Sequence, residues 1–240
     1  MVLILARLNP KKRTSQKSSP QTLQEESISY RVAAPLRRQL HCIDLFAGCG
    51  GLSLGLEESG FQPLLFSEIN PQAAETYIAN RVGMGIIPVG DVYNLTDLDL
   101  NLLKTSWRYN GIADIDLVCG GPPCQGYSGI GHRRTFKLDK QDIPSNHLFQ
   151  EMVRVIRCVR PKMFLFENVR GLLNAKWTPE GQSGEIFKAV LDEFKTLTDY
   201  RIRWDLVHAK NYGVPQNRPR VIMVGIRDDK DCIANNHWQN

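Results

Sequence analysis

Short apolar runs alternate with amphipathic stretches between His41 and Ile226. Compact apolar runs bounded by Gly, Pro or Asp are typical of buried strands, whereas apolar positions that recur every three or four residues are typical of helices. The pattern predicts strands at 42–46, 63–67, 86–89, 115–119, 162–166, 201–207 and 221–226. It predicts helices at 51–59, 71–80, 148–159 and 186–194.

This alternation predicts an α/β fold with a mostly parallel sheet and helices on both faces. In such sheets, ligands bind beyond the carboxyl ends of the strands. Residues that follow directly after a predicted strand are therefore the first candidates for a functional site.

The first 40 residues have a different composition, rich in Ser, Gln, Lys and Pro. We interpret 1–40 as a disordered basic tail and 41–240 as one folded domain. The tail holds eight Lys or Arg and two Asp or Glu, while the whole chain carries +5, so the folded part is close to −1. Bulk charge therefore does not indicate nucleic-acid binding, and the Lys11–Arg13 cluster could contact phosphates or only aid solubility.

Two classes of protein are disfavoured by composition. No apolar run approaches the ~20 residues of a membrane span. The six cysteines show neither a CxxC pair nor zinc-ligand spacing. We expect a cytoplasmic protein with mostly reduced thiols, no membrane segment and no metal site.

A glycine-rich motif, Asp44–Gly51 (DLFAGCGG), follows the first predicted strand. Glycines there allow a tight turn and close approach to a ligand. Ser53 breaks the GxGxxG pattern, which disfavours a dinucleotide site. Glu68 could accept hydrogen bonds from the two hydroxyls of an adenosine ribose. Asp91 could accept a hydrogen bond from the adenine amino group. Ile69 and Val92 could lie on the two faces of the adenine ring. The three elements together favour an adenosyl ligand over a dehydrogenase cofactor or a simple turn. The candidates in the first motif are Phe46, Ala47, Gly48, Gly50 and Gly51.

A second motif, 120–128 (GGPPCQGYS), places Cys124 in a loop at the carboxyl edge of the sheet. Cysteines used only for packing usually lie inside strands or helix faces, as expected for Cys42, Cys119 and Cys158. A nucleophilic thiol must be partly exposed and able to ionise. Cys124 is therefore the candidate nucleophile.

Two further motifs carry charge to the same edge. Glu167 follows the apolar run 164–166 and could donate a proton, although a helix cap or a surface carboxylate would also fit. Arg218 and Arg220 stand at alternate positions, so they should point the same way and could bind an anion or carbonyl oxygen and hold Glu167.

Six features together resemble the cytosine C5 DNA methyltransferase family, and they extend from about His41 to Ile226. They are DLFAGCGG, Glu68, Asp91, GGPPCQGYS, ENV (167–169) and QNRPR (216–220). The resemblance implies a Rossmann-like S-adenosylmethionine-dependent methyltransferase fold and double-stranded DNA as substrate, as in restriction–modification systems. It implies that Cys124 adds to C6 of a flipped-out cytosine, Glu167 acts at N3, and Arg220 with Arg218 binds O2. Pro122 would border the cofactor. The loop after Cys124 would meet the DNA through Gln125, Ser128, Arg133 and Arg134.

The sequence departs from the family pattern in two places. The stretch Asp142–Asn146 lacks the arginine of the usual Asp-x-Arg element. Only about 14 residues follow Ile226. This stretch is too short to hold the family's target-recognition region and its last motif. A second polypeptide could supply both, the chain could be a fragment, or it could act alone with little specificity. A tRNA cytosine C5 methyltransferase, a non-catalytic regulatory subunit and a nicotinamide-dependent oxidoreductase are the alternatives to a DNA enzyme.

Overall fold

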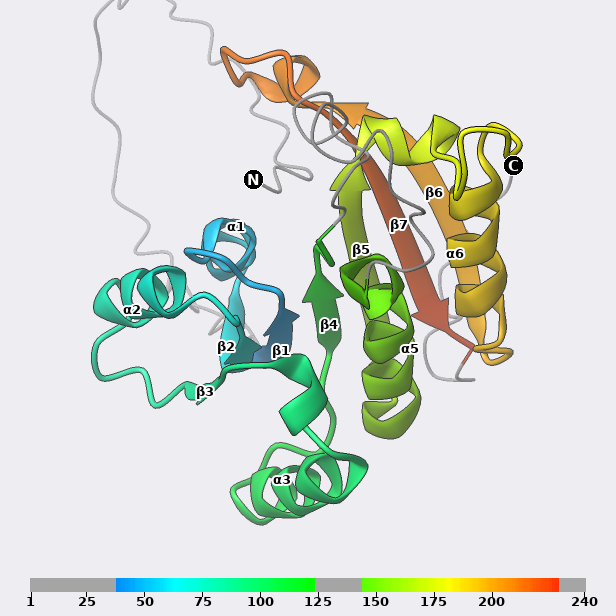
Figure 1. Ribbon diagram of the computed structural model, residues 1–240. Helices are drawn as coiled ribbons and strands as arrows, with labels where there is room; N and C mark the ends of the chain where they lie inside the picture. Colours follow the sequence, from blue (N-terminus) through cyan, green and yellow to red (C-terminus); the bar gives the residue numbers. More distant parts are fainter. Residues whose placement is uncertain (1–37, 124–143, 229–240) are drawn as a thin grey trace, which may run out of the picture.

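The computed structural model describes residues 38–123 and 144–228, which form a seven-stranded sheet in the order β3-β2-β1-β4-β5-β7-β6 (Figure 1). The strands are β1 (Leu40–Leu45), β2 (Phe61–Ser67), β3 (Ile87–Val89), β4 (Leu117–Gly120), β5 (Met163–Val169), β6 (Tyr200–His208) and β7 (Pro219–Arg227). All neighbouring pairs are parallel except the two that involve β7. The predicted mostly parallel sheet is confirmed.

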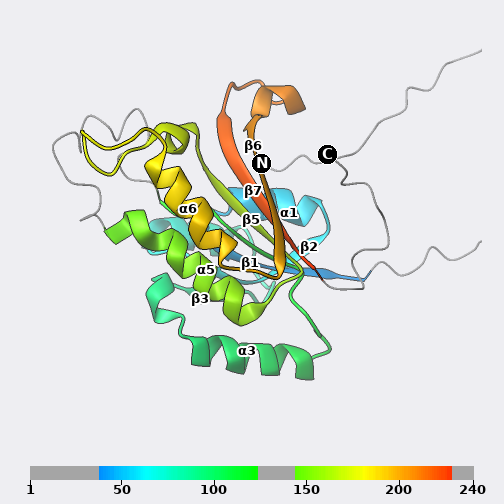
Figure 2. The ribbon, with the colours of Figure 1, turned by 90° about the vertical axis from the view of Figure 1, so that its right-hand side faces the viewer.

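The helices lie on both faces of this sheet, as predicted (Figure 2). They are α1 (Gly51–Glu58), α2 (Pro71–Ala79), α3 (Asp97–Tyr109), α5 (Leu148–Val159) and α6 (Glu185–Lys195), with short 3₁₀ segments η1 (Val92–Asn94), η3 (Pro144–His147), η4 (Arg170–Asn174) and η5 (Ala209–Tyr212). The main apolar core joins one sheet face to α3, α5 and α6. A smaller core packs α1 on the opposite face, and Tyr77 of α2 stacks on Phe66 beside it.

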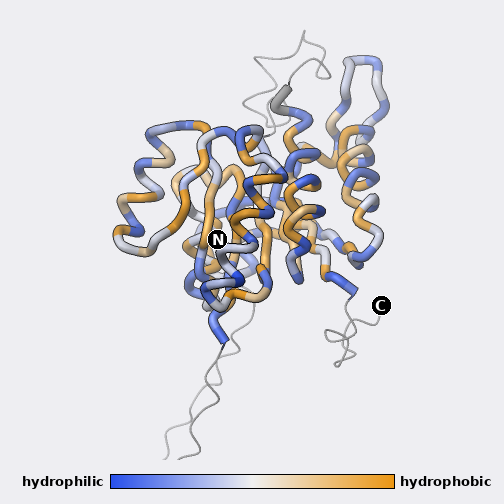
Figure 3. Tube along the Cα trace, turned by 90° about the horizontal axis from the view of Figure 1, so that it is seen from below, coloured by the Kyte–Doolittle hydropathy of each residue, from blue (hydrophilic) through white to orange (hydrophobic). Residues whose placement is uncertain are grey.

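Apolar residues concentrate in the strands and alternate with polar residues along the helices (Figure 3). In α5, for example, Met152, Val153 and Ile156 are fully buried. This spacing is the helical repeat on which the prediction of the segment rested. The sequence pattern therefore located this helix correctly, from 148 to 159.

Helix α3 is absent from the sequence prediction. Its leucines at 98, 100, 102 and 103 give no clear helical face, and of the residues in the helix only Leu100 and Trp107 are buried. The helix begins instead with a capping box, in which Thr96 and Asp99 exchange hydrogen bonds with each other's backbone N–H. A Thr-x-x-Asp signal of this kind can mark a helix start where hydrophobic periodicity fails.

Several predicted strand ends are wrong by a few residues. The predicted strand 162–166 ends before Glu167, but β5 continues to Val169 and Glu167 pairs with Ile222 of β7. Glu68 lies just after the end of β2, and Arg218 just before β7. The last residues of β5 stay in the sheet because their backbone groups pair with β7, and an apolar run in the sequence does not indicate such pairing.

None of the helices in the described ranges is long and apolar enough to cross a bilayer.

Candidate functional site

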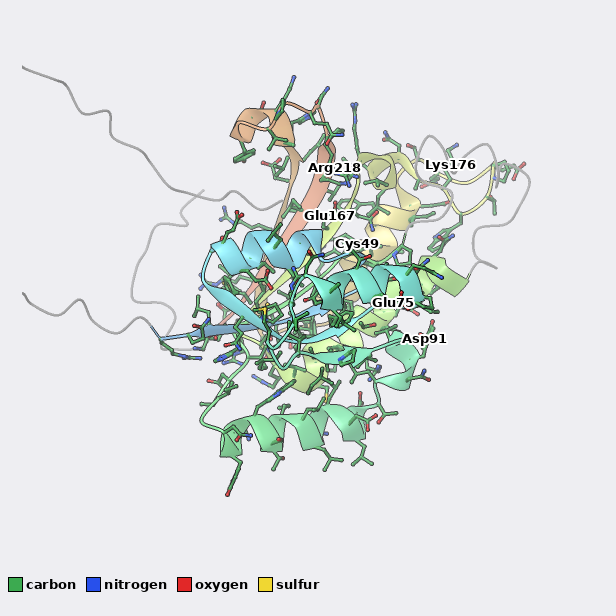
Figure 4. The ribbon with its side chains drawn as sticks, turned by 90° about the vertical axis from the view of Figure 1, so that its left-hand side faces the viewer. Cys49, Glu75, Asp91, Glu167, Lys176 and Arg218 are labelled. Carbon is green, nitrogen blue, oxygen red and sulfur yellow. The ribbon has the colours of Figure 1, made fainter. Side chains whose placement is uncertain are left out.

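A cavity of about 520 Å³ opens at the carboxyl edge of the sheet. It lies where the end of β1, the start of α1, the end of β5 and the β6–β7 connection meet. Six of the residues predicted for the site line it: Phe46, Ala47, Gly51, Glu167, Arg218 and Arg220. Figure 4 shows Glu167 and Arg218 close together above α1. The structure therefore brings the glycine-rich turn and the acid–arginine group to one cavity.

The glycine-rich turn has a left-handed backbone at Phe46, Gly48 and Gly50, with φ of 57°, 56° and 86°. L-residues rarely adopt this region, so Gly48 and Gly50 meet a requirement of the turn. The amide of Ala47 donates to the Ser67 carbonyl at 2.9 Å, and the amide of Gly50 donates to the Ala47 carbonyl at 2.9 Å. The first bond ties the turn to the end of β2, and the second closes the bend that leads from β1 into α1.

Glu68 is tied to this turn by its carboxylate. Oε2 accepts the Gly48 amide at 2.8 Å, and Oε1 accepts the Asn70 amide at 2.8 Å. A carboxylate oxygen can accept more than one hydrogen bond, so both oxygens retain capacity for a ligand hydroxyl. Glu68 thus lies beside the turn, as its predicted role requires.

The residues predicted for the adenine ring do not line the cavity. Asp91 caps η1 by accepting the Tyr93 amide at 3.0 Å, and it lies apart from Glu167 in Figure 4. Ile69 is 70% exposed, whereas Val92 is 3% exposed and belongs to the main core. The predicted sandwich therefore pairs a surface side chain with a buried one.

Glu167 and Arg220 form the charged pair of the cavity. Arg220 Nε lies 2.7 Å from Glu167 Oε1, an ion pair without the alignment of a hydrogen bond. The Arg220 Nη1 donates to the Pro219 carbonyl at 2.8 Å. Both side chains remain partly accessible, at 20% for Arg220 and 29% for Glu167. This contact places Arg220, one of the two arginines predicted to hold Glu167, directly beside it.

The end of β4 approaches this pair closely. A Cβ added to Gly121 would lie 3.1 Å from Glu167 Oε2, so a glycine here keeps the approach to that oxygen open. The buried Pro122 has its carbonyl bound by the Asn168 side-chain amide at 3.2 Å. Cys124, Gln125, Ser128, Arg133 and Arg134 lie outside the described residues.

Asp44 is a cavity residue that sequence reasoning did not assign. It is 1% exposed, and its Oδ2 accepts the Ser53 hydroxyl at 2.6 Å. Burial raises the pKa of Asp44 to about 6, while the hydrogen bond from Ser53 opposes the rise. This carboxyl sits inside the glycine-rich motif, but its type and position alone gave no sign of its burial.

A second group of cavity residues runs from the β6–β7 connection into β7, and of these the sequence analysis assigned only Arg218 and Arg220. Tyr212, Val214, Gln216, Arg218, Arg220 and Ile222 all line the cavity at alternate positions. The sequence revealed this two-residue repeat only for the arginine pair. Before the arginine pair, Gly213 stands between the cavity residues Tyr212 and Val214. Its positive φ of 81° breaks the strand-like conformation, so alternation along the sequence did not indicate these two residues.

The cysteines expected to serve packing behave as predicted at three positions. Cys42 and Cys119 are fully buried, and Cys158 is partly buried. Burial is the main factor that raises the pKa of each thiol and so keeps it protonated. These three thiols are unsuited to nucleophilic chemistry.

A seven-stranded, mostly parallel sheet with a glycine-rich turn after its first strand defines a Rossmann-like α/β fold, the class predicted above for an S-adenosylmethionine-dependent methyltransferase. A family model for the C-5 cytosine-specific DNA methylase matches residues 40–240. The chain belongs to this family.

Two curated relatives are Type II methyltransferases. The chain is 39% identical to M1.HphI of Haemophilus parahaemolyticus over 78% of its length, and 36% identical to M.DdeI of Desulfomicrobium norvegicum over 80%. It spans 45% and 41% of their own lengths.

Solved structures agree on the fold. A crystal structure described as a DNA modification methyltransferase encoded within an E. coli prophage superposes with a TM-score of 0.59 at 30% identity, over 78% of this chain and 47% of that one. The S. pombe Dnmt2 methyltransferase gives a TM-score of 0.52 at 21% identity, over 80% of this chain and 50% of that one. The second likeness shows the fold alone.

Proposed function

We propose that this chain carries the catalytic part of a DNA (cytosine-5-)-methyltransferase that uses S-adenosylmethionine and acts on double-stranded DNA. The observation that carries the proposal is the cavity itself. The glycine-rich turn and the Glu167–Arg220 pair line one space, in a chain that belongs to the C-5 cytosine methylase family.

The turn residues fit S-adenosylmethionine as the methyl donor. The left-handed backbone at Gly48 and Gly50 allows close approach of a ligand, and Glu68 keeps acceptor capacity for ribose hydroxyls beside it. Phe46, Ala47, Gly51 and Pro122 would border the cofactor, and its adenine would have to reach beyond the cavity to meet Ile69, Asp91 and Val92, which do not line it. Bound there, S-adenosylmethionine supplies an electrophilic methyl group.

The charged pair fits the target base. Because Arg220 engages Oε1 of Glu167, Oε2 is the oxygen left to meet N3 of a cytosine, and Gly121 leaves its approach open. Arg218 and Arg220 would bind the cytosine O2. These contacts withdraw electron density from the ring and favour nucleophilic attack at C6.

Cys124 would supply the nucleophile. It follows Gly121 by three residues, so chain connectivity alone keeps the two Cα atoms within roughly 11 Å. The thiolate would bond to C6 and the C5 carbon would then take the methyl group. Loss of the C5 proton and departure of the Cys124 sulfur would restore the aromatic ring. Such attack requires an everted base, with Gln125, Ser128, Arg133 and Arg134 meeting the DNA backbone.

DNA is favoured over tRNA because the relatives at 36–39% identity are Type II methyltransferases. Membership of a cytoplasmic restriction–modification system would follow. We further propose that the tail predicted at 1–40 ends just before β1, which begins at Leu40, and that the residues from there to 240 form the catalytic domain. Target recognition would then come from a second polypeptide or from sequence that the relatives carry in their additional length.

Transfer of labelled methyl groups tests the proposal. The chain is assayed on duplex DNA and on tRNA, alone and with a polypeptide that supplies the remaining part of a relative. Incorporation into C5 of cytosine in DNA supports the proposal. Incorporation only into tRNA would favour the RNA alternative, and none in any arm would favour a non-catalytic subunit.

A further inference from the structure

A buried arginine beneath the glycine-rich turn has no role in the chemistry above. Arg81 follows the end of α2, and its side chain is only 5% exposed. A buried charge is costly unless it is paired and hydrogen-bonded. The partners of the Arg81 guanidinium therefore indicate its structural role.

Each nitrogen of the Arg81 guanidinium has a partner. Nε lies 2.6 Å and Nη2 3.2 Å from the two carboxylate oxygens of Glu57 on α1. Nη2 also donates to the Gly50 carbonyl at 3.0 Å, and Nη1 donates to the Tyr77 carbonyl at 3.2 Å. One side chain thus joins the end of α2, the last turn of α1 and the turn that precedes α1.

The turn packs directly against this arginine. A Cβ placed on Gly50 would lie 2.5 Å from Arg81 Nη1 and 2.7 Å from Tyr77 Cδ2. The guanidinium carbon itself lies 4.1 Å from the centre of the Tyr77 ring. The Gly50 backbone is therefore seated on an Arg81–Tyr77 surface.

The same surface continues to the cavity through hydrogen bonds. The Tyr77 hydroxyl lies 2.8 Å from the Ser53 hydroxyl, which donates to Asp44 at 2.6 Å. Asp44 and Gly51 both line the cavity. Because the peptide bond is planar, fixing the Gly50 carbonyl also fixes the plane in which the Gly51 amide lies.

We propose that Arg81 is a positioning residue that sets the Gly50–Gly51 peptide for S-adenosylmethionine. It acts through the Gly50 carbonyl and does not contact the cofactor. The proposal rests on the proposed function, because it assigns the turn to that ligand. Loss of Arg81 should loosen the turn and weaken cofactor binding beyond what loss of stability explains.

Arg227 offers a matched control. Counted over the whole residue, Arg227 and Arg81 are both 8% exposed, and Arg227 also donates to a backbone carbonyl, that of Arg160. It lies at the end of β7, at the opposite edge of the sheet from the turn. Arg227→Met should therefore destabilise the protein without changing the turn.

Two readouts on the full chain test Arg81. Amide hydrogen exchange in peptides covering 48–54 should be at least tenfold faster in Arg81→Met than in wild type, and unchanged in Arg227→Met. The Kd for S-adenosylhomocysteine should rise at least tenfold in Arg81→Met and less than twofold in Arg227→Met. Arg81→Lys, which cannot reach Glu57 and Gly50 with the same fork, should fall between wild type and Arg81→Met.

The outcomes separate the two proposals. Equal exchange at 48–54 in Arg81→Met and Arg227→Met would overturn the role of Arg81, as would equal rises in Kd. A wild-type chain that binds no S-adenosylhomocysteine, alone or with a complementing polypeptide, would count against the proposed function. The exchange comparison would then still decide whether Arg81 holds the turn.

Discussion

Replacing Gly50 with alanine should lower the free energy of unfolding by about 2–5 kcal/mol. The first contribution is conformational: at φ 86° an L-residue costs about 1–2 kcal/mol. The second is steric, because the new Cβ would overlap Arg81 Nη1 at 2.5 Å and Tyr77 Cδ2 at 2.7 Å. Overpacking of this kind typically costs about 1–3 kcal/mol.

Gly111→Ala separates these two contributions. Gly111 has nearly the same φ, 85°, but no atom lies within 4 Å of its added Cβ. Denaturant unfolding of both variants should show Gly50→Ala to be less stable than Gly111→Ala by about 1–3 kcal/mol. Equal losses in the two variants would refute the argument that Arg81 and Tyr77 form a fixed surface under the turn.

Two further predictions concern carboxyl groups. Burial raises the pKa of Asp44 to about 6, above its ordinary value of 3.8, so the folded state binds the proton more tightly than the unfolded state. This stabilisation is present at low pH and is lost as the pH rises through this window. The loss is roughly 3 kcal/mol, and Asp44→Asn, which still accepts from Ser53, should flatten unfolding free energy between pH 4 and 6; equal slopes in the two proteins would contradict this. Glu167→Gln should lower kcat for methyl transfer by about 10²–10⁴-fold while leaving the Kd for S-adenosylhomocysteine within twofold; a kcat within tenfold of wild type would exclude Glu167 as the acid.

Much of the fold could be predicted from hydrophobic periodicity. The strands and the helices α1, α5 and α6 carry apolar residues at the expected spacing, and α2 is marked by Pro71 at its start, so sequence analysis placed them within a few residues. Helix α3 was missed because it buries only Leu100 and Trp107 and depends on its cap. The true end of β5 was missed because its last residues are held by pairing with β7.

The candidate site could be predicted only where chemistry-bearing residues form a compact motif. The Glu167–Arg220 pair and the turn at Gly48 and Gly50 were found in this way. Tyr212 and Asp44 were not, because cavity lining depends on how the β6–β7 connection and α1 pack together. Arg81 reaches Gly50 across 31 positions of sequence, a contact that no local pattern encodes.

Trapping with 5-fluorocytosine DNA tests the central claim most directly, because a base cannot remove fluorine from C5 as it removes the proton, so the thiol adduct persists. Duplex oligonucleotides are offered with S-adenosylmethionine, to the chain alone and with a complementing polypeptide. We predict a covalent complex for wild type and for Cys49→Ser, whose thiol is exposed in the glycine-rich turn, and none for Cys124→Ser. A complex that survives Cys124→Ser, or no complex with wild type in either arm, would contradict the assignment of Cys124 as the nucleophile.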